Sequence, residues 1–154
     1  MTWTTNDIPD LTGRVAVVTG ATGGLGVATA IELARHGARL VITARDASRA
    51  DDAVARILAE TPGAEVQVVS LDLAALADVK RAALDVLERH DRIDILVNNA
   101  GIMATPRRTT VDGFELQIGT NHIGHFAWTA GLWPALVAGQ ARIVSVSSLA
   151  HLQA

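Results

Sequence analysis

The residues with the clearest capacity for chemistry form a glycine-rich segment, Thr19-Gly-Ala-Thr-Gly-Gly-Leu-Gly26. It follows a continuous apolar run, Arg14-Val-Ala-Val-Val-Thr19, and precedes a stretch with apolar residues at helical spacing. A turn between strand and helix exposes backbone N–H groups at the positive end of the helix dipole, and glycines let phosphate oxygens approach closely. An ordinary connection is the plain alternative, but this context favours a dinucleotide pyrophosphate site. The candidate binding residues are Thr19, Gly20, Thr22, Leu25 and Gly26, with either Gly24 or Gly23 as the middle glycine.

The glycine spacing fits two registers, Gly20/Gly24/Gly26 and Gly20/Gly23/Gly26, because Gly23 and Gly24 are adjacent. No Gly-Lys-Ser/Thr follows, which disfavours a phosphate-loop nucleoside triphosphatase. An S-adenosylmethionine site shares the architecture, but it usually needs an acidic residue after the second strand to hold the ribose hydroxyls. The residues at that position therefore distinguish between ligands.

The second expected strand runs into Ala44-Arg45 rather than into Asp or Glu. No carboxylate stands there to bind the 2′-hydroxyl of NAD, whereas the Arg45 guanidinium could pair bidentately with a 2′-phosphate. We therefore expect NADP as the cofactor and NAD as the less favoured one. The preference would weaken if Arg45 were only a solvated surface charge or if Asp46 turned inward. Asp46 is otherwise expected to cap the following helix.

Several polar residues have a plain structural reading beside a chemical one. Asp72 and Leu73 follow the third expected strand, where Asp72 could accept from the adenine amino group or cap the third helix. His122 and His125 stand three residues apart on one expected helix, which suggests a metal pair. Because no third ligand is evident, we expect packing or surface roles for both histidines and no metal site.

The elements that position these residues alternate along the chain. Short apolar runs typical of buried strands alternate with longer segments of helical periodicity, which predicts βα units and a mainly parallel sheet. The expected strands cover residues 14–19, 39–43, 65–71, 93–97 and 142–146, and the expected helices cover residues 24–36, 47–60, 74–89 and 112–137. Asp112 is expected to cap the last helix, in which Gly119, Gly124, Gly131 and Pro134 predict kinks. The expected fold class is α/β, a Rossmann-type doubly wound parallel sheet that stops after its fifth strand.

Length and composition set the outer limits. The 154 residues suit one domain, expected to span 1–154 with its core in residues 13–148. A net charge of −3 with interspersed charges excludes the basic block that nucleic-acid binding needs, and the absence of cysteine excludes disulfides and thiolate metal sites. No window approaches the roughly 20 apolar residues of a membrane span, and residues 1–10 lack the pattern of a secretory signal. We therefore expect a cytoplasmic protein without a membrane span.

Four segments, in this order, resemble the short-chain dehydrogenase/reductase family. They are Thr19-Gly-Ala-Thr-Gly-Gly-Leu-Gly26, Asn98-Asn-Ala-Gly101, Thr120-Asn-His-Ile-Gly-His-Phe126 and Arg142-Ile-Val-Ser-Val-Ser-Ser-Leu-Ala-His151. The resemblance covers nearly the entire chain, and Asn-Asn-Ala-Gly favours the Gly20/Gly24/Gly26 register. The last two segments are most similar to the retinol-dehydrogenase-like branch and its bacterial oxidoreductase relatives.

The resemblance implies hydride transfer between a nicotinamide and an alcohol or ketone, with an apolar small-molecule substrate. It implies that the backbone carbonyl of Asn121 orders a relay water and that Ser148 hydrogen-bonds the substrate oxygen. Asn98, Ala100 and Gly101 would line the cofactor wall near the inner ribose. Taken alone, Asn121 could simply bond a neighbouring helix, and Ser148 could terminate a strand.

The family's general acid/base is a tyrosine in a Tyr-x-x-x-Lys motif downstream of the serine, and this sequence contains no tyrosine. We therefore expect the N-terminal part of an NADP-dependent alcohol dehydrogenase or carbonyl reductase. Because acid/base catalysis contributes about 10²–10⁴ in rate, negligible turnover is expected from these residues alone. The alternative is a non-catalytic nucleotide-binding or interaction module. Residues 142–146 are expected to form an apolar sheet edge, and any homo-oligomer is expected to be weakened.

Overall fold

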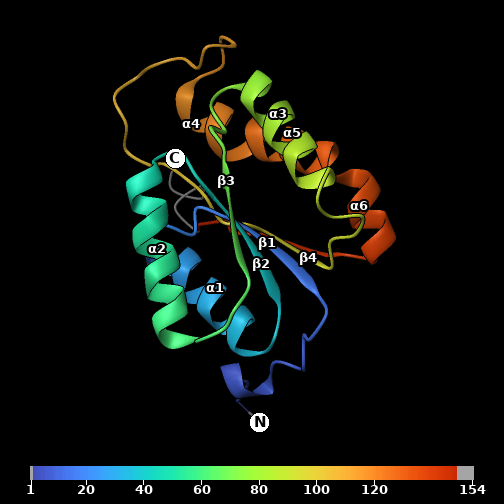
Figure 1. Ribbon diagram of the computed structural model, residues 1–154. Coiled ribbons are helices and arrows are strands. Elements are labelled where there is room, and N and C mark those ends of the chain that lie inside the picture. The colour runs from blue at the N-terminus through green and yellow to red at the C-terminus, as the bar shows by residue number, and fades with distance from the viewer. Residues whose placement is uncertain (1, 149–154) are drawn as a thin grey trace.

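Five short apolar segments form one parallel sheet in the computed structural model, which describes residues 2–148 (Figure 1). The spatial order of the strands is β3-β2-β1-β4-β5, and every neighbouring pair is parallel. The strands are β1 (Val15–Thr19), β2 (Arg39–Ala44), β3 (Val66–Ser70), β4 (Ile95–Asn98) and β5 (Arg142–Ser145). All five lie within a few residues of the segments expected from the apolar runs.

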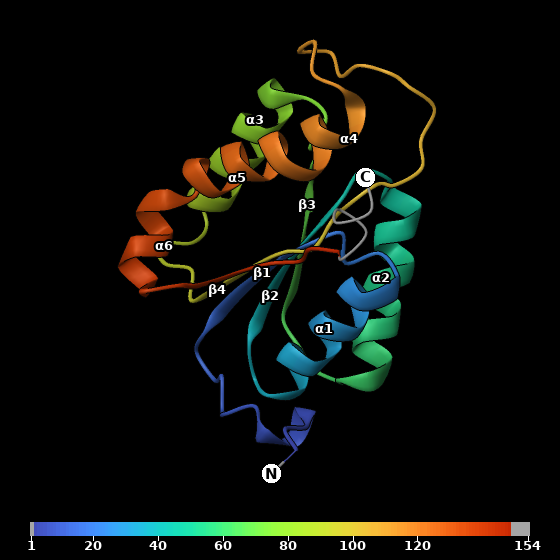
Figure 2. The same cartoon turned by 180° about the vertical axis from the view of Figure 1, so that it is seen from behind.

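Helices cover both faces of the sheet. Figures 1 and 2 show α1 (Gly24–Arg35) and α2 (Ala47–Glu60) on one side, and α3 (Leu76–Leu87), α5 (His125–Gly131) and α6 (Trp133–Gly139) on the other. A short 3-10 helix, Thr5–Asp7, precedes the sheet near the N-terminus. The doubly wound α/β fold predicted from the sequence is confirmed.

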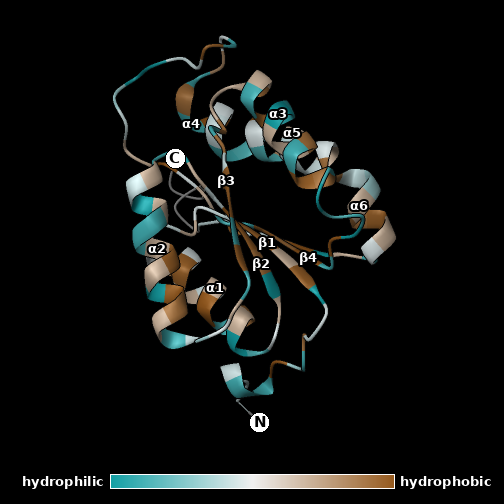
Figure 3. Cartoon of the chain, viewed as in Figure 1, coloured by the Kyte–Doolittle hydropathy of each residue, from teal (hydrophilic) through white to brown (hydrophobic). Residues whose placement is uncertain are grey.

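The core consists of two hydrophobic clusters that the strands separate. Side chains of a strand alternate between the two faces, so Val15 and Val17 of β1 pack with α3 and α5, whereas Ala16 and Val18 pack with α1 and α2. All five residues of β1 are buried, as expected of a central strand covered on both sides. Figure 3 shows the hydrophobic residues concentrated along the strands.

The predicted long helix over residues 112–137 is wrong in its start and in its continuity. The helical region begins with α4 (Leu116–Ile118), because the Glu115 carboxylate caps it by accepting from the backbone N–H groups of Gln117 and Ile118 at 3.0 and 2.9 Å. Asp112, the expected cap, instead accepts from the Leu76 N–H at 2.9 Å and so ties this loop to α3.

A π-helix, η2 (Gly119–Gly124), follows α4 and leads directly into α5. Its two terminal glycines allow close packing, since a Cβ on Gly119 would lie 2.5 Å from Thr110 Cγ2 and one on Gly124 would lie 2.3 Å from the Leu73 carbonyl oxygen. A further break at Leu132 separates α5 from α6, which carries Pro134 in its first turn. The glycines and the proline therefore mark the interruptions, as predicted, while the π-helical turn was not anticipated.

A buried carboxylate joins the starts of β1 and β4. Asp94 Oδ2 accepts from the Val15 N–H at 2.9 Å, and Oδ1 accepts from Arg14 Nη1 at 2.7 Å and from Arg92 Nη2. Burial raises the pKa of Asp94, but the donated hydrogen bonds from Val15, Arg92 and Arg14 outweigh it and leave the pKa below the usual aspartate value.

Replacing Asp94 by asparagine is expected to lower the free energy of unfolding at pH 7 by about 1.5–3 kcal/mol, the range for a hydrogen bond to a charged group. Because the folded pKa is lowered, the unfolded chain binds more protons in acid, and this stabilisation is lost as the pH falls through the acidic range. Urea unfolding of both proteins between neutral and acidic pH measures the effect. Asp91→Asn, at an exposed neighbour, is the control; an equal loss in both variants would contradict the assignment.

The sheet edge at β5 is exposed in the part of the chain that the structure describes. All four residues of β5 are exposed, and its only strand neighbour among residues 2–148 is β4. Ile143 and Val144 contribute apolar side chains to this edge, which confirms the expectation for this strand. Within the same residues, no helix has the length and apolar character needed to span a membrane.

Candidate functional site

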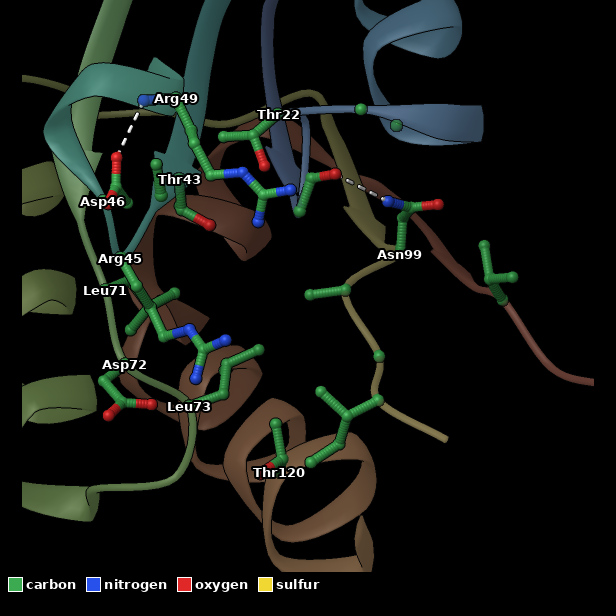
Figure 4. A pocket seen from close by; sticks show the side chains of 18 of the residues that line it. Thr22, Thr43, Arg45, Asp46, Arg49, Leu71, Asp72, Leu73, Asn99 and Thr120 are labelled. Carbon is green, nitrogen blue, oxygen red and sulfur yellow. Dashed lines mark hydrogen bonds between the residues drawn. The ribbon is translucent and has the colours of Figure 1, made fainter. Parts of the chain in front are cut away.

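A groove of about 810 Å³ lies where the carboxyl ends of the central strands meet. β1 pairs with β2 on one side and with β4 on the other. The connection from β1 to β2 runs through α1 on one face of the sheet, whereas the connection from β3 to β4 runs through α3 on the other face, so the strand order reverses at β1 (Figure 1). Open parallel sheets bind ligands at such a switch point. The groove is lined by the glycine turn and by the residues that follow β2, β3 and β4 (Figure 4).

The glycine turn adopts a backbone that requires glycine at three positions. Gly20 and Gly24 have φ of +68° and +52°, in the left-handed region, whereas Gly23 is extended at 179°. A Cβ on Gly26 would lie 2.3 Å from the Gly20 carbonyl oxygen and 2.5 Å from Asn99 Nδ2. The structure therefore supports the Gly20/Gly24/Gly26 register over the alternative that uses Gly23.

Asn99 holds this turn from the neighbouring strand end. Its Nδ2 donates to the carbonyl oxygen of Thr19 at 2.9 Å and to that of Gly20 at 3.3 Å, and Figure 4 draws the second of these bonds. Sequence reasoning selected its neighbours Asn98 and Ala100 and missed Asn99. The available signal was its place in Asn-Asn-Ala-Gly, directly after a strand that pairs with β1.

Two guanidinium groups enter the groove beyond the end of β2. Arg45 follows β2 directly, Arg49 lies in the first turn of α2, and both side chains are exposed and point into the groove (Figure 4). Asp46 Oδ1 accepts from the Arg49 N–H at 2.9 Å, so Asp46 caps α2 as predicted. Arg49 was missed by sequence reasoning, although it lines the same groove as Arg45.

The residues after β3 form the opposite side of the groove. Asp72 Oδ1 accepts from the Ala74 N–H at 2.9 Å, and α3 has Ala75 at its N-cap position, so the interpretation of Asp72 as that cap is wrong. Leu73 is buried beside it. Thr120, which sequence reasoning missed, lines the groove, and its buried Oγ1 has no hydrogen-bond partner among residues 2–148.

Most of the predicted cofactor residues line the groove. They are Gly20, Thr22, Leu25, Gly26, Arg45, Asp72, Leu73, Ala100 and Gly101. Three others lie elsewhere: Thr19 is fully buried behind the turn, Gly24 begins α1, and Asn98 faces a second groove, with its Nδ2 donating to Thr129 Oγ1 at 3.1 Å.

The second groove, of about 830 Å³, shares residues 99–102 and Val146 with the first. Both predicted catalytic residues, Asn121 and Ser148, line it. The Asn121 side chain accepts from the Ile102 N–H at 2.9 Å and donates to the Ile102 carbonyl at 2.8 Å, so it fixes the segment that separates the two grooves. The exposed apolar side chains of Met103 and Phe126 also line this groove.

The two histidines of η2 and α5 have different surroundings. His122 is exposed, whereas His125 is buried, with its ring nitrogens at 2.8 Å from Thr19 Oγ1 and 2.9 Å from the Asn121 carbonyl oxygen. In the described part of the chain, no group of three His, Cys, Asp or Glu side chains is placed to hold a metal ion. His151, at the end of the fourth sequence segment, lies outside the described residues.

Known proteins resemble this chain over nearly all of its length. A family model described as short chain dehydrogenase matches residues 14–154. An uncharacterized oxidoreductase of Schizosaccharomyces pombe is 43% identical over 159 residues, covering 99% of this chain and 47% of that protein. Retinol dehydrogenase 13 of Homo sapiens is 44% identical over 141 residues, covering 91% of this chain and 43% of that protein.

Solved structures of short-chain oxidoreductases share this fold. The crystal structure of a metagenomic short-chain oxidoreductase in complex with NADP superposes with a TM-score of 0.78 at 35% identity, covering 91% of this chain and 64% of that one. The chain spans about half the length of the curated relatives it matches.

Proposed function

Because the chain belongs to the short-chain dehydrogenase/reductase family of oxidoreductases, we propose that its groove binds NADP in preference to NAD. The observation that carries this proposal is the pair of guanidinium groups, Arg45 and Arg49, that enter the groove where β2 ends. A 2′-phosphate brings about two negative charges, and arginine binds phosphate oxygens through several N–H donors at once. An NAD site would instead present a carboxylate to the 2′-hydroxyl.

The rest of the groove fits the remainder of a dinucleotide. The turn at residues 20–26 exposes backbone N–H groups at the start of α1, where a pyrophosphate would be held. Asp72 offers carboxylate oxygens beside Leu73 for the adenine side, and Ala100 and Gly101 form the wall toward the second groove. The NADP bound to the metagenomic relative is consistent with this proposal.

We further propose that the second groove receives an alcohol or carbonyl substrate. A bound nicotinamide would supply or accept the hydride, Ser148 would hydrogen-bond the substrate oxygen, and the Asn121 carbonyl would hold a relay water. The exposed side chains of Met103 and Phe126 favour an apolar substrate. No tyrosine occurs in the 154 residues, so these residues alone are expected to show negligible turnover.

The proposal predicts a difference between the two cofactors in thermal stability. At about 100 times its dissociation constant, NADPH is expected to stabilise the fold by about 2.7 kcal/mol and raise the melting temperature by roughly 5–10 °C. NADH at the same concentration is expected to give a clearly smaller shift. Scanning fluorimetry with NADPH, NADH and adenosine 2′,5′-bisphosphate measures the three shifts.

The third compound carries the 2′-phosphate without a nicotinamide, so it tests the arginine side of the groove by itself. It is expected to compete with NADPH. Equal shifts for NADPH and NADH would contradict the proposed preference, and no shift with either would contradict nucleotide binding.

A further inference from the structure

His125 connects two parts of the site that are far apart in sequence. It is 6% exposed, and one ring nitrogen, Nε2, lies 2.8 Å from Thr19 Oγ1 at the end of β1. The other, Nδ1, lies 2.9 Å from the carbonyl oxygen of Asn121. The ring therefore bridges the central strand and the π-helix that carries a candidate catalytic residue.

The neighbours of Thr19 determine which atom donates in each of these bonds. Thr19 Oγ1 accepts from the backbone N–H groups of Asn99 and Ala100, both at 3.0 Å, which occupies its two lone pairs. Its hydroxyl proton therefore needs an acceptor. His125 Nε2 at 2.8 Å serves this better than the Val97 carbonyl oxygen at 3.5 Å.

The Asn121 carbonyl can only accept, so His125 Nδ1 must carry the proton on that side. The two bonds together require a neutral ring with hydrogen on Nδ1 and none on Nε2. Burial favours the same neutral form, because it lowers the pKa of His125 more than the bond to Asn121 raises it.

We propose that His125 is a positioning residue that, as the neutral Nδ1–H tautomer, ties the backbone carbonyl of Asn121 to the wall of the cofactor groove. The hydrogen bonds run from the Asn99 and Ala100 N–H groups to Thr19, from the Thr19 hydroxyl to His125, and from His125 to Asn121. The role in cofactor binding rests on the proposed function, whereas the tautomer follows from this geometry alone.

A second set of hydrogen bonds links Asn121 to the wall between the two grooves. The Asn121 side chain forms two hydrogen bonds with the backbone of Ile102, which follows the same wall segment. Asn121 is thus fixed to the wall through its side chain by one route and through its carbonyl by another. The route through the carbonyl starts within the π-helix η2, which carries Asn121, and passes through the His125 ring to Thr19 at the end of β1.

The tautomer can be measured on the cofactor-free protein. A long-range ¹H–¹⁵N spectrum at neutral pH is expected to show His125 Nδ1 as the protonated nitrogen and Nε2 as the unprotonated one. The exposed His122 provides an internal comparison within the same helical region. A proton on Nε2, or a doubly protonated ring at pH 7, would overturn the proposal whether or not any nucleotide binds.

Cofactor affinity tests the consequence for the wall. His125→Phe keeps an aromatic ring but removes both hydrogen bonds, and it is expected to weaken NADPH binding about two- to tenfold, the range for one neutral hydrogen bond. His125→Gln keeps an acceptor for the Thr19 hydroxyl and is expected to retain most of the affinity. His122→Phe is the matched control and is expected to bind NADPH like the parent.

The two measurements separate the possible failures. If the parent protein does not bind NADPH, the proposed function fails, while the spectrum still decides the tautomer. If the tautomer is as expected but the Phe and Gln variants bind NADPH equally well, the positioning role is overturned. If His125→Phe fails to fold, the Gln variant and the spectrum of the parent protein still decide the outcome.

Discussion

Replacing Gly26 by alanine is expected to weaken NADPH binding on the order of 100-fold, equivalent to about 2.7 kcal/mol of binding free energy. A Cβ at this position would lie 2.3 Å from the Gly20 carbonyl oxygen and 2.5 Å from Asn99 Nδ2. The first of these atoms is backbone and cannot move without reshaping the turn. The shift would also break the two bonds by which Asn99 holds Thr19 and Gly20, so the exposed N–H groups would lose their arrangement.

Titration calorimetry with NADPH measures this effect, and a packing variant away from the groove provides the control. A Cβ on Gly131 would lie 2.8 Å from Ala83 Cβ, where α5 contacts α3. Gly131→Ala is therefore expected to lower the melting temperature and to leave NADPH affinity unchanged. If both glycine variants lost affinity in proportion to their lost stability, the specific role of Gly26 would be wrong.

Replacing Arg45 by alanine is expected to weaken NADPH binding about 10- to 100-fold and to leave NADH binding within about twofold. A charge-assisted hydrogen bond contributes about 1.5–3 kcal/mol, which corresponds to this range of affinity. NADH lacks the 2′-phosphate and therefore loses no partner. The difference between the two cofactors should consequently disappear in this variant, as measured by binding titrations with each.

Arg49→Ala is expected to produce a smaller loss in the same direction, because this guanidinium enters the groove from the first turn of α2 rather than from the strand end. Lys80→Ala removes the same charge from an exposed position on α3 and serves as the control for net charge. Equal losses for NADPH and NADH in Arg45→Ala would show that Arg45 contacts a part of the cofactor common to both.

The fold was predictable because its signals are local and mutually consistent. Each strand is an apolar run of the length that a buried parallel strand needs, and a glycine or proline follows the ends of β1, α1 and α2 within two residues. The Asp46 cap of α2 was predictable for the same reason, since it depends only on a residue type at a helix start.

The helical region after residue 112 was less predictable because tertiary contacts decide it. Asp112 has the side chain of a capping residue, but its carboxylate accepts a hydrogen bond from the Leu76 N–H at the start of α3. Glu115 caps α4 instead. Helical periodicity also does not predict the π-helix η2, whose terminal glycines, Gly119 and Gly124, approach Thr110 and Leu73 closely.

The candidate site likewise contains residues that local sequence predicts and residues whose roles depend on tertiary contacts. Strand ends and the glycine turn could be predicted, since the order of the motifs places Arg45 and Gly26 at the carboxyl end of the sheet, where both line the first groove. The roles of Thr120 and His125 could not be predicted, because they depend on side-chain directions across elements separated by many residues. Asn99 was missed although its place in Asn-Asn-Ala-Gly offered a signal. From the sequence, a histidine at helical spacing is equally compatible with core packing and with a hydrogen-bonded link between two elements. Only the positions of Thr19 and Asn121 in the structure distinguish these two roles for His125.

The segment at residues 99–102 forms part of both grooves, and this sharing has a thermodynamic consequence. If a ligand in one groove changes the affinity of the other groove for its ligand, the second ligand changes the affinity for the first by the same factor, because coupling between two binding equilibria is reciprocal. Under the proposed function, a substitution within residues 99–102 that changes substrate affinity is therefore expected to change affinity for the dinucleotide as well. Met103 and Phe126 line the second groove alone, so substitutions there are expected to alter the proposed substrate range and to leave dinucleotide affinity unchanged.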